Sequence, residues 1–302
     1  MKVSISNRQG KVILESIESK TGKVSEVQLA LQQKFPKYSI HRQRLTFVKD
    51  GNTHVLASNE QLATYGIKDD DVIIFKDLGP QIGWSTVFLI EYFGPILIHA
   101  LFYLFPTVFY GSASVQPHSN IQTIAFVLVV LHFIKRELET LYVHRFSNAT
   151  MPIRNLPKNC FHYWVLGGVF VAYPLYQPGY QSYFGEITNS TVLMVLVGLW
   201  SFAQFSNLKT HLILRNLRPA GTTIRKIPKG YGFDLVSCPN YLFEISCWII
   251  FSILTGSVTS WIFTLIGAGQ MYLWAVKKHL RYKKDFGTEY PKNRKVLIPF
   301  AL

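Results

Sequence analysis

The amino-acid sequence predicts an α-helical, polytopic membrane protein with about six transmembrane helices, preceded by a soluble N-terminal domain. Hydrophobic residues make up 49% and aromatic residues 15% of the 302 residues, although the first 80 residues are polar. Six apolar segments follow, near the about 17–25 residues that cross a bilayer as a helix, with the second distinctly short. They lie at residues 82–105, 121–134, 160–176, 187–205, 241–258 and 259–276. We therefore expect one domain at 1–79 and a transmembrane domain at 80–302.

The N-terminal domain shows the pattern of a small α/β fold. Alternating apolar residues predict four strands, and one stretch with a helical period predicts a helix. In chain order these are two strands at 3–5 and 12–14, a helix at 24–35, and two strands at 44–48 and 72–75. This order, with the segments LTFVKDG and LATYGIKDDDVIIF, resembles the ubiquitin-like β-grasp. Such a domain either serves only as a folding and anchoring domain without a partner or offers a docking surface. Both stay open, because a fold does not dictate a function.

The distribution of Lys and Arg predicts the orientation. Of the 31 Lys and Arg residues, 12 lie in the first 80 and the other 19 lie in the loops at 135–158, 209–229 and 277–295. The loops at 110–120, 177–186 and 256–260 contain none. Because Lys and Arg concentrate on the cytoplasmic side, we expect both termini in the cytosol.

The net charge of +14 does not indicate a nucleic-acid-binding protein. The basic residues lie in short loops beside apolar segments rather than on a soluble face with exposed aromatic residues. Contact with anionic lipid explains most of this charge, and an anionic ligand at the cytosolic rim is a second use. The nine histidines are dispersed and three cysteines form no metal-binding spacing, so no metal site is predicted.

Two acidic residues lie inside apolar segments, where inserting a carboxylate at the centre of a membrane helix costs about 3 kcal/mol. Glu91 lies in the first segment, shortly before Pro95, which can loosen the helix. Glu244 lies in the fifth, four residues after Asn240, so the two share one helical face. A polar bridge between helices is the structural alternative, but an intramembrane ionisable group favours a functional site.

Two polar stripes extend the second and fourth apolar segments at steps of three or four residues. The first consists of His132, Lys135, Glu139 and Tyr142, and the second of Asn207, His211, Arg215 and Arg218. Amphipathic interfacial helices also show a basic face, and for the arginines alone that alternative is equally good. The convergence of amide, imidazole, phenol, carboxylate and guanidinium groups at one depth favours a ligand with a charged head and an apolar tail.

Three segments resemble a known family. GYGFDLVSCPNYLFEISCW and KKHLRYKKDFGTEYPKNRKVLIPF are similar to the C-terminal signature of the steroid 5α-reductase family. LETLYVHRFSNATMPIRNLPKNCFHYW is similar to its trans-2-enoyl-CoA reductase branch, which also has a ubiquitin-like module, ending here in FKDLG. The resemblance covers essentially the whole chain. It implies reduction of trans-2,3-enoyl-CoA to saturated acyl-CoA with NADPH, in the very-long-chain fatty acid elongation cycle at the endoplasmic reticulum membrane.

The same resemblance implies a cofactor site. Contacts to the dinucleotide phosphates or the adenosine end would come from Asn207, His211, Arg215 and Arg218, contacts to the nicotinamide region from Asn240 and Glu244, and the rest from His279, Tyr282 and Arg294. In the steroid-reducing relatives an acidic residue stands at the position of His211. The family's substrate-end Glu and Tyr fall on Glu91 and Tyr142.

Reduction of an α,β-unsaturated thioester needs a hydride at the β-carbon, stabilisation of the carbonyl oxygen and a proton at the α-carbon. A buried tyrosine can donate that proton, and a neighbouring Lys or His favours its phenolate afterwards. We expect Tyr142 as proton donor or oxygen clamp, surrounded by Lys135, Glu139 and His144, with Tyr241 as the rival donor.

Two other functions remain open. A steroid or polyprenol reductase of the same superfamily would share the cofactor half and differ in the first three helices. A non-enzymatic scaffold or transporter would need polar residues along a path across the bilayer, whereas here they cluster at one side. The sequence leaves open the acyl length, the oligomeric state, the partner of the N-terminal module, six against seven helices, and which tyrosine donates. Association with other elongation-cycle enzymes is implied by the resemblance alone.

Overall fold

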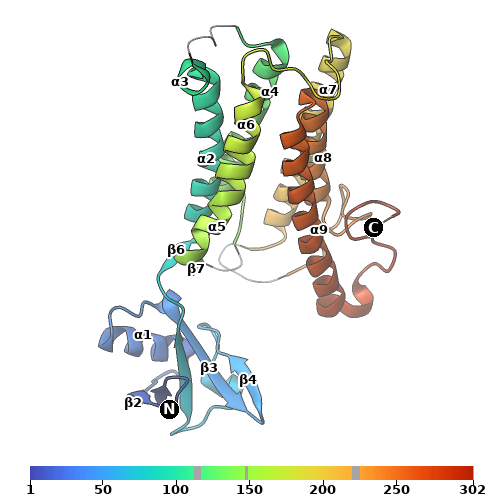
Figure 1. Cartoon of the computed structure of the whole chain (residues 1–302). Coiled ribbons are helices and arrows are strands. Elements are labelled where there is room, and N and C mark those ends of the chain that lie inside the picture. The colour runs from blue at the N-terminus through green and yellow to red at the C-terminus, as the bar shows by residue number, and fades with distance from the viewer. Residues whose placement is uncertain (112–116, 147–148, 220–224, 302) are drawn as a thin grey trace. The chain divides into compact units, whose positions relative to one another are not determined.

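The computed structural model describes residues 1–111, 117–146, 149–219 and 225–301. The chain forms two compact units, one of Met1–Trp84 with Asn148–Leu156, and one of Ser85–Ser147 with Pro157–Leu302. In Figure 1 the chain is coloured from blue at its N-terminus, through teal and green, to red at its C-terminus. The loops predicted at 110–120, 135–158 and 209–229 each contain residues outside the described ranges.

The first unit contains a five-stranded sheet covered by one helix. The strands are β1 (Lys2–Ser6), β2 (Val12–Glu18), β3 (Gln43–Lys49), β4 (Asn52–Val55) and β5 (Val72–Asp77), in the spatial order β2-β1-β5-β3-β4. The central pair β1 and β5 is parallel, and the other pairs are antiparallel. Helix α1 (Val24–Lys34) packs Val27 and Leu31 on Ile5 and Ile73, and all four side chains are fully buried. Single turns of 3₁₀-helix, Ile40–Arg42 and Leu62–Tyr65, complete it.

The β3–β4 hairpin follows directly from its turn residues. Asp50 and Gly51 connect the strands, and both have positive φ, 49° and 75°. A two-residue hairpin loop with two positive φ angles matches the twist of the flanking strands, and Asp-Gly is a favoured pair for it. The pairing of Lys49 with Asn52 therefore sets the register of the whole hairpin.

An ion pair ties this sheet to the preceding 3₁₀-turn and predicts a pH dependence. Arg42 donates from Nε and Nη2 to the two oxygens of Asp77, at 3.0 and 2.6 Å. The hydrogen bond from Arg42 lowers the pKa of Asp77 below its ordinary value. A lowered pKa stabilises the fold above the unfolded-state pKa, and this contribution disappears as the pH falls through the folded-state pKa.

We therefore expect hydrogen exchange in β5 of the full-length protein to accelerate on acidification more than in an Asp77→Asn variant. The side chains are 23% and 33% exposed, so the contribution is at most about 1 kcal/mol. Identical pH profiles in the two proteins would contradict this assignment.

A second, two-stranded sheet joins the start of the first predicted membrane segment to a later loop. Strand β6 (Gln81–Gly83) pairs antiparallel with β7 (Thr150–Pro152), with Ile82 opposite Met151. The sequence analysis did not predict it, because each strand has three residues and lies beside a longer apolar or basic signal. It binds residues 149–156 into the first unit.

The second unit is helical. It contains α2 (Trp84–Leu104), α3 (Pro106–Tyr110), α4 (Asn120–Tyr142), α5 (Leu156–Cys160), a π-helix (Phe161–Val169), α6 (Phe170–Leu175), α7 (Ser190–Asn216), α8 (Pro239–Thr255) and α9 (Val258–Phe286), with 3₁₀-turns at Ile153–Asn155 and Gly287–Glu289. Figure 1 shows the long helices running alongside one another. Its largest fully buried side chains include Phe133, Tyr176 and Phe251, which belong to the apolar core of this unit.

Two of the described helices, α2 and α7, are long and apolar enough by composition to cross a bilayer, and α8 is a shorter apolar helix. The predicted second segment is the first part of a helix that continues past residue 134 to Tyr142. The predicted third segment divides into α5, the π-helix and α6, with Pro174 inside the last. The chain thus has helix over all six predicted segments, while the count of six spans stays a prediction.

The helical unit also contains a buried histidine that acts within its core. His99 of α2 is 0% exposed, and its ring nitrogens bond the Tyr176 hydroxyl at 2.7 Å and the Gly167 carbonyl at 3.0 Å. Both nitrogens are therefore used, as buried polar groups require. His99 fastens α2 to the π-helix and to the end of α6.

Helix α2 meets the π-helix at a glycine with no room for a side chain. The Trp164 indole donates to the Ile90 carbonyl at 2.9 Å, and its ring covers Gly94 so closely that a Cβ there would overlap the indole. Gly94→Ala should displace Trp164 and destabilise the protein by about 1–3 kcal/mol through overpacking. Thermal unfolding of the detergent-purified protein measures this.

The matched control is Gly198→Ala in α7, where no atom of another part of the described chain lies within 4 Å of the added Cβ. In a helix interior that change should be neutral or stabilising by about 0.5–1 kcal/mol, because alanine has less backbone entropy than glycine to lose when the chain folds. Equal unfolding midpoints for both variants would show that the Trp164 contact does not constrain α2.

Candidate functional site

A column of buried polar side chains lies where α4, α7 and α8 pack together, in layers one helical turn apart. The first layer contains Lys135 of α4, Asn207 of α7 and Asn240 of α8. Lys135 Nζ donates to Asn207 Oδ1 at 2.5 Å, and Asn207 Nδ2 donates to the Asn240 backbone carbonyl at 2.8 Å. Asn207 and Asn240 are buried, at 1% and 5% exposure. The layer joins three helices through one asparagine.

The second layer contains His132, Gln204 and Glu244, again one residue from each helix. Gln204 Nε2 donates to His132 Nδ1 at 2.8 Å, and His132 Nε2 lies 3.2 Å from Glu244 Oε1. Below it the three helices present apolar side chains; the His132 ring meets Trp248 edge to face, with centroids 4.9 Å apart. The second layer is therefore the floor of the polar column.

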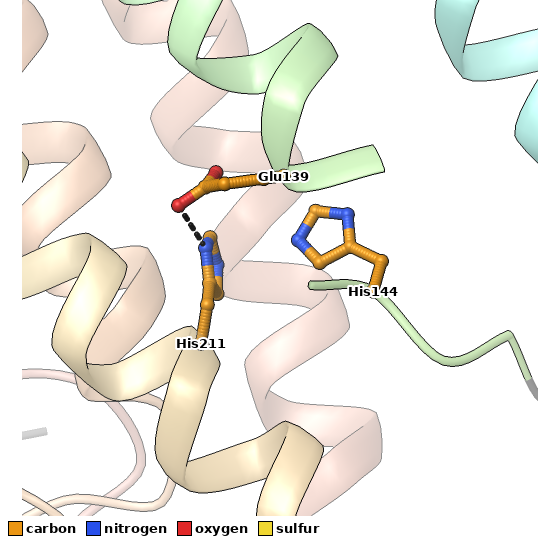
Figure 2. Close-up of side chains that lie close together, drawn as sticks. All are labelled: Glu139, His144 and His211. Atoms are coloured by element: carbon orange, nitrogen blue, oxygen red, sulfur yellow. Dashed lines mark hydrogen bonds and ion pairs between the residues drawn. The ribbon is translucent and has the colours of Figure 1, made fainter. Parts of the chain in front are cut away.

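The third layer joins Glu139 of α4 to His211 of α7 (Figure 2). Glu139 Oε1 lies 3.0 Å from His211 Nδ1 and 3.3 Å from Lys135 Nζ, and Oε2 accepts a hydrogen bond from Arg136 Nη1 at 2.6 Å. Glu139 is 1% exposed. One buried carboxylate thus balances two cationic side chains and orients an imidazole.

His144 approaches the same carboxylate from the loop after α4, and its ring centroid lies 4.9 Å from that of His211 (Figure 2). Potential metal-ligand atoms of Glu139, His144 and His211 lie within 4.8 Å of one another. Lys135 and Arg136 already pair with the carboxylate, and their charge opposes a further cation. Burial, followed by the Arg136 charge, lowers the pKa of His144 to about 3, so its imidazole is neutral at neutral pH. The chemistry of this cluster is that of a buried ion-pair network.

Arg136 carries this network to α2. Its Nη2 donates to the Tyr92 hydroxyl at 2.9 Å, and its guanidinium carbon lies 5.1 Å from the Tyr92 ring centroid. Glu91, the neighbouring residue, is 2% exposed, bonds Asn159, and has no partner for its Oε1 among the described residues. The first predicted intramembrane acid is therefore buried beside the network with one oxygen unpaired.

Three buried acceptor atoms near the first two layers have no donor in the described part of the chain. They are Gln204 Oε1, Asn240 Oδ1 and Glu244 Oε2. Leaving a buried acceptor unpaired costs about 1–3 kcal/mol, so these atoms need an explanation. A ligand with N–H donors would satisfy them.

The C-terminal segment forms a second polar cluster around Ser237. Its Oγ lies 2.6 Å from His279 Nδ1 and 2.6 Å from the Tyr290 hydroxyl, and it donates to the Lys295 carbonyl at 3.1 Å. Arg294 is 4% exposed and donates to the Pro228 carbonyl at 3.1 Å. The tail is thereby fastened to α9, with Arg294 Nε buried and unpaired among the described residues.

The remaining predicted cofactor residues lie at the helix ends. Tyr282 of α9 stacks on Tyr290 with ring centroids 5.6 Å apart. Arg215 lies in the last turn of α7, half-buried. Arg218 follows the helix, and its Nη1 donates to the Arg145 carbonyl at 3.3 Å. Guanidinium groups therefore lie one to two turns beyond His211.

The two candidate proton donors differ in surroundings. The Tyr142 side chain, at the end of α4, is 67% exposed and has no hydrogen bond among the described residues. The Tyr241 ring is half-buried, with Lys278 Nζ 4.9 Å from its centroid. The structure thus joins Lys135 and Glu139 directly and leaves Tyr142 outside their hydrogen bonds; its role stays a prediction.

Comparison with known proteins decides the family. The model of the 3-oxo-5-alpha-steroid 4-dehydrogenase family matches residues 149–302. A Dictyostelium discoideum protein named very-long-chain enoyl-CoA reductase is 50% identical over 82% of this chain and 80% of its own. The chain belongs to the 3-oxo-5-alpha-steroid 4-dehydrogenase family. A Caenorhabditis elegans protein named probable very-long-chain enoyl-CoA reductase is 42% identical over 96% of this chain and 94% of its own. A mouse protein named trans-2,3-enoyl-CoA reductase-like is 36% identical over 76% of this chain and 64% of its own.

In this 3-oxo-5-alpha-steroid 4-dehydrogenase family member, the matched region provides α7, α8 and α9, and therefore two of the three helices of the polar column. The third helix, α4, lies before residue 149 and supplies Lys135 and Glu139. The C. elegans relative covers nearly the whole chain, including α4. The family match and the full-length relatives together thus span every layer.

Several residues of the network were not singled out from the sequence. Arg136 bonds Glu139 within α4 and Tyr92 of α2, and Gln204 joins α7 to α4. Ser237 joins the segment before α8 to His279 of α9. Gln204 lies three residues before Asn207 and could have been found by extending the second polar stripe inward. Ser237 and Tyr92 gave no periodic signal, because their partners come from distant parts of the chain.

Proposed function

We propose that this protein reduces trans-2-enoyl-CoA thioesters to saturated acyl-CoA with NADPH. The observation that carries the proposal is the identity of 50% over most of both chains to a protein named very-long-chain enoyl-CoA reductase. The layered polar column supports it, because a membrane scaffold needs no buried acceptors without donors. The name of that relative also supports very-long acyl chains as substrates.

The residues fit a nicotinamide dinucleotide phosphate. The unpaired Asn240 Oδ1 and Glu244 Oε2 suit the N–H donors of a carboxamide. Arg215 and Arg218 suit the phosphates, since guanidinium groups bind phosphate in bidentate geometry. The ribose phosphate that distinguishes NADPH from NADH suits the basic helix ends. When bound, NADPH supplies the hydride for the β-carbon.

The protein's own residues then hold the substrate and manage the proton. Tyr142 donates a proton to the α-carbon or holds the thioester oxygen, and Tyr241 is its rival. Lys135 and Arg136 of α4 lie in the network, where their positive charge favours developing negative charge on the substrate, and the neutral His144 lies beside them. The paired Glu139 keeps this positive charge in place without neutralising it, because two cations share one carboxylate. Glu91, whose Oε1 has no partner among the described residues, contributes at the substrate end.

The acyl chain enters between helices from the bilayer, where each buried CH₂ contributes about 0.8 kcal/mol. We place the protein in the endoplasmic reticulum membrane with six spans and both termini in the cytosol, supported by the one-sided Lys and Arg distribution. There it acts in the elongation cycle, beside the enzymes that condense, reduce and dehydrate the acyl chain.

We also propose that residues 1–79 form a ubiquitin-like β-grasp domain. The strand order β2-β1-β5-β3-β4, with β1 and β5 parallel at the centre and α1 packed on the sheet, supports it. The domain offers the reductase a cytosolic anchoring or docking module.

The assay uses purified full-length protein with NADPH and a long trans-2-enoyl-CoA, followed by loss of nicotinamide absorbance and by mass of the product. We expect a product two hydrogens heavier than the substrate. Consumption of a steroid enone with no turnover of enoyl-CoA would assign the protein to the steroid-reducing branch. No oxidation of NADPH with either substrate would favour a scaffold.

A further inference from the structure

The second layer of the polar column holds one carboxylate oxygen and leaves the other without a donor. Glu244 Oε1 lies 3.2 Å from His132 Nε2, whereas Oε2 has no partner among the described residues. A carboxylate held at one oxygen cannot turn freely, so the second oxygen faces a fixed direction. That arrangement suits recognition of a single donor group.

Gln204 determines which nitrogen of the imidazole carries the proton. Its amide nitrogen has only donors to offer, and it lies 2.8 Å from His132 Nδ1. Nδ1 must therefore accept, and the ring proton lies on Nε2, which donates to Glu244 Oε1. The amide and the imidazole form one directed chain that ends on the carboxylate.

Packing fixes this chain in place. His132 is 3% and Gln204 6% exposed. The His132 ring contacts Trp248 and Phe133 edge to face, with centroids 4.9 Å away in both cases. Both side chains lie in the second layer, directly against apolar side chains. A rotated imidazole there would leave two buried polar atoms unpaired.

We infer that His132 is a positioning residue, which with Gln204 orients Glu244 so that its free oxygen accepts the carboxamide N–H of the nicotinamide. This inference rests on the proposed function, since it takes NADPH as the ligand. His132 does not itself touch the cofactor. Its effect reaches only the nicotinamide end, because the phosphate-binding arginines lie beyond the third layer.

The test compares two ligands on full-length protein in detergent, NADPH and adenosine 2′,5′-bisphosphate, which lacks the nicotinamide. His132→Phe keeps the aromatic ring against Trp248 and removes both ring nitrogens. We expect its affinity for NADPH to fall about tenfold, the loss of one hydrogen bond to a charged group. Its affinity for the bisphosphate should equal that of the wild type.

A second ligand pair isolates the amide. The acetylpyridine analogue of NADPH replaces the carboxamide NH₂ by a methyl group. The wild type should prefer NADPH over this analogue, and His132→Phe should lose the preference. His132→Gln, which retains an N–H within reach of Glu244, should recover part of it. His41→Phe, at an exposed histidine of the first unit, is the matched control and should change none of these affinities.

The outcomes separate the two claims. Equal losses for NADPH and the bisphosphate in His132→Phe would show a general structural role and overturn the inference. A wild type that binds neither ligand would overturn the proposed function. If His132→Phe does not fold, Gln204→Met replaces it. Removing the donor to Nδ1 should weaken NADPH selectively, and unchanged discrimination in that variant would overturn the inference as well.

Discussion

Replacing Glu139 by glutamine is expected to destabilise the protein by about 3–5 kcal/mol, the cost of breaking a buried ion pair by removing one partner. The variant keeps the shape of the side chain but removes the carboxylate that pairs directly with Lys135 and Arg136. Lys135 keeps Asn207 and Arg136 keeps Tyr92, so the hydrogen bonds survive in part while the charge balance does not. The free energy of unfolding in detergent, compared with the wild type, measures the loss.

A second substitution tests whether Lys135 is coupled to Glu139. In Glu139→Gln with Lys135→Met one cation is removed together with the anion, so the double variant should be more stable than the sum of the single effects by about 0.5–3 kcal/mol. Glu186→Gln, at an exposed acid, is the neutral control. Additive effects of the two changes would show that Lys135 and Glu139 do not act as a pair.

The polar stripes show how far sequence reasoning reaches. Steps of three and four residues place Lys135 with Glu139, and Asn207 with His211, and the structure has both pairs on continuous helices. The periodicity could not say that α4 and α7 face each other, because that depends on how the helices pack in three dimensions. The contact of Glu139 with His211 joins residues 72 positions apart. Such a partner leaves no local signal.

Hydropathy alone ends the second apolar segment at 134, where charged residues begin, and the polar stripe predicted that the helix continues to Tyr142. Helix α4 does end at Tyr142, with its charges paired inside the unit. The π-helix at Phe161–Val169 was not predicted. Its buried Gly167 and Gly168 let α2 and α9 approach closely, and Ile98 and Phe263 occupy the space that side chains would fill. Apolar composition alone does not distinguish a π-helix from an α-helix.

Replacing Tyr142 by phenylalanine is expected to lower kcat for enoyl-CoA reduction by about 100-fold or more, the contribution typical of a positioned general acid. The fold should be unaffected. The side chain is 67% exposed and makes no hydrogen bond among the described residues, so loss of the hydroxyl removes no internal contact. A fall in turnover without a change in the unfolding midpoint therefore reports on the chemistry.

Tyr241→Phe provides the comparison, because both tyrosines are candidates and both variants lose one hydroxyl. If Tyr142 donates the proton, its variant should lose turnover while Tyr241→Phe retains most of it. The reverse order would transfer the donor role to Tyr241, and full activity in both would assign the proton to water. Deuterium taken up from the solvent at the α-carbon of the product, measured by mass, distinguishes loss of proton transfer from loss of hydride transfer. An exposed hydroxyl can act as a positioned general acid only once the acyl-CoA covers it, so we expect the effect of Tyr142→Phe on kcat to exceed its effect on KM.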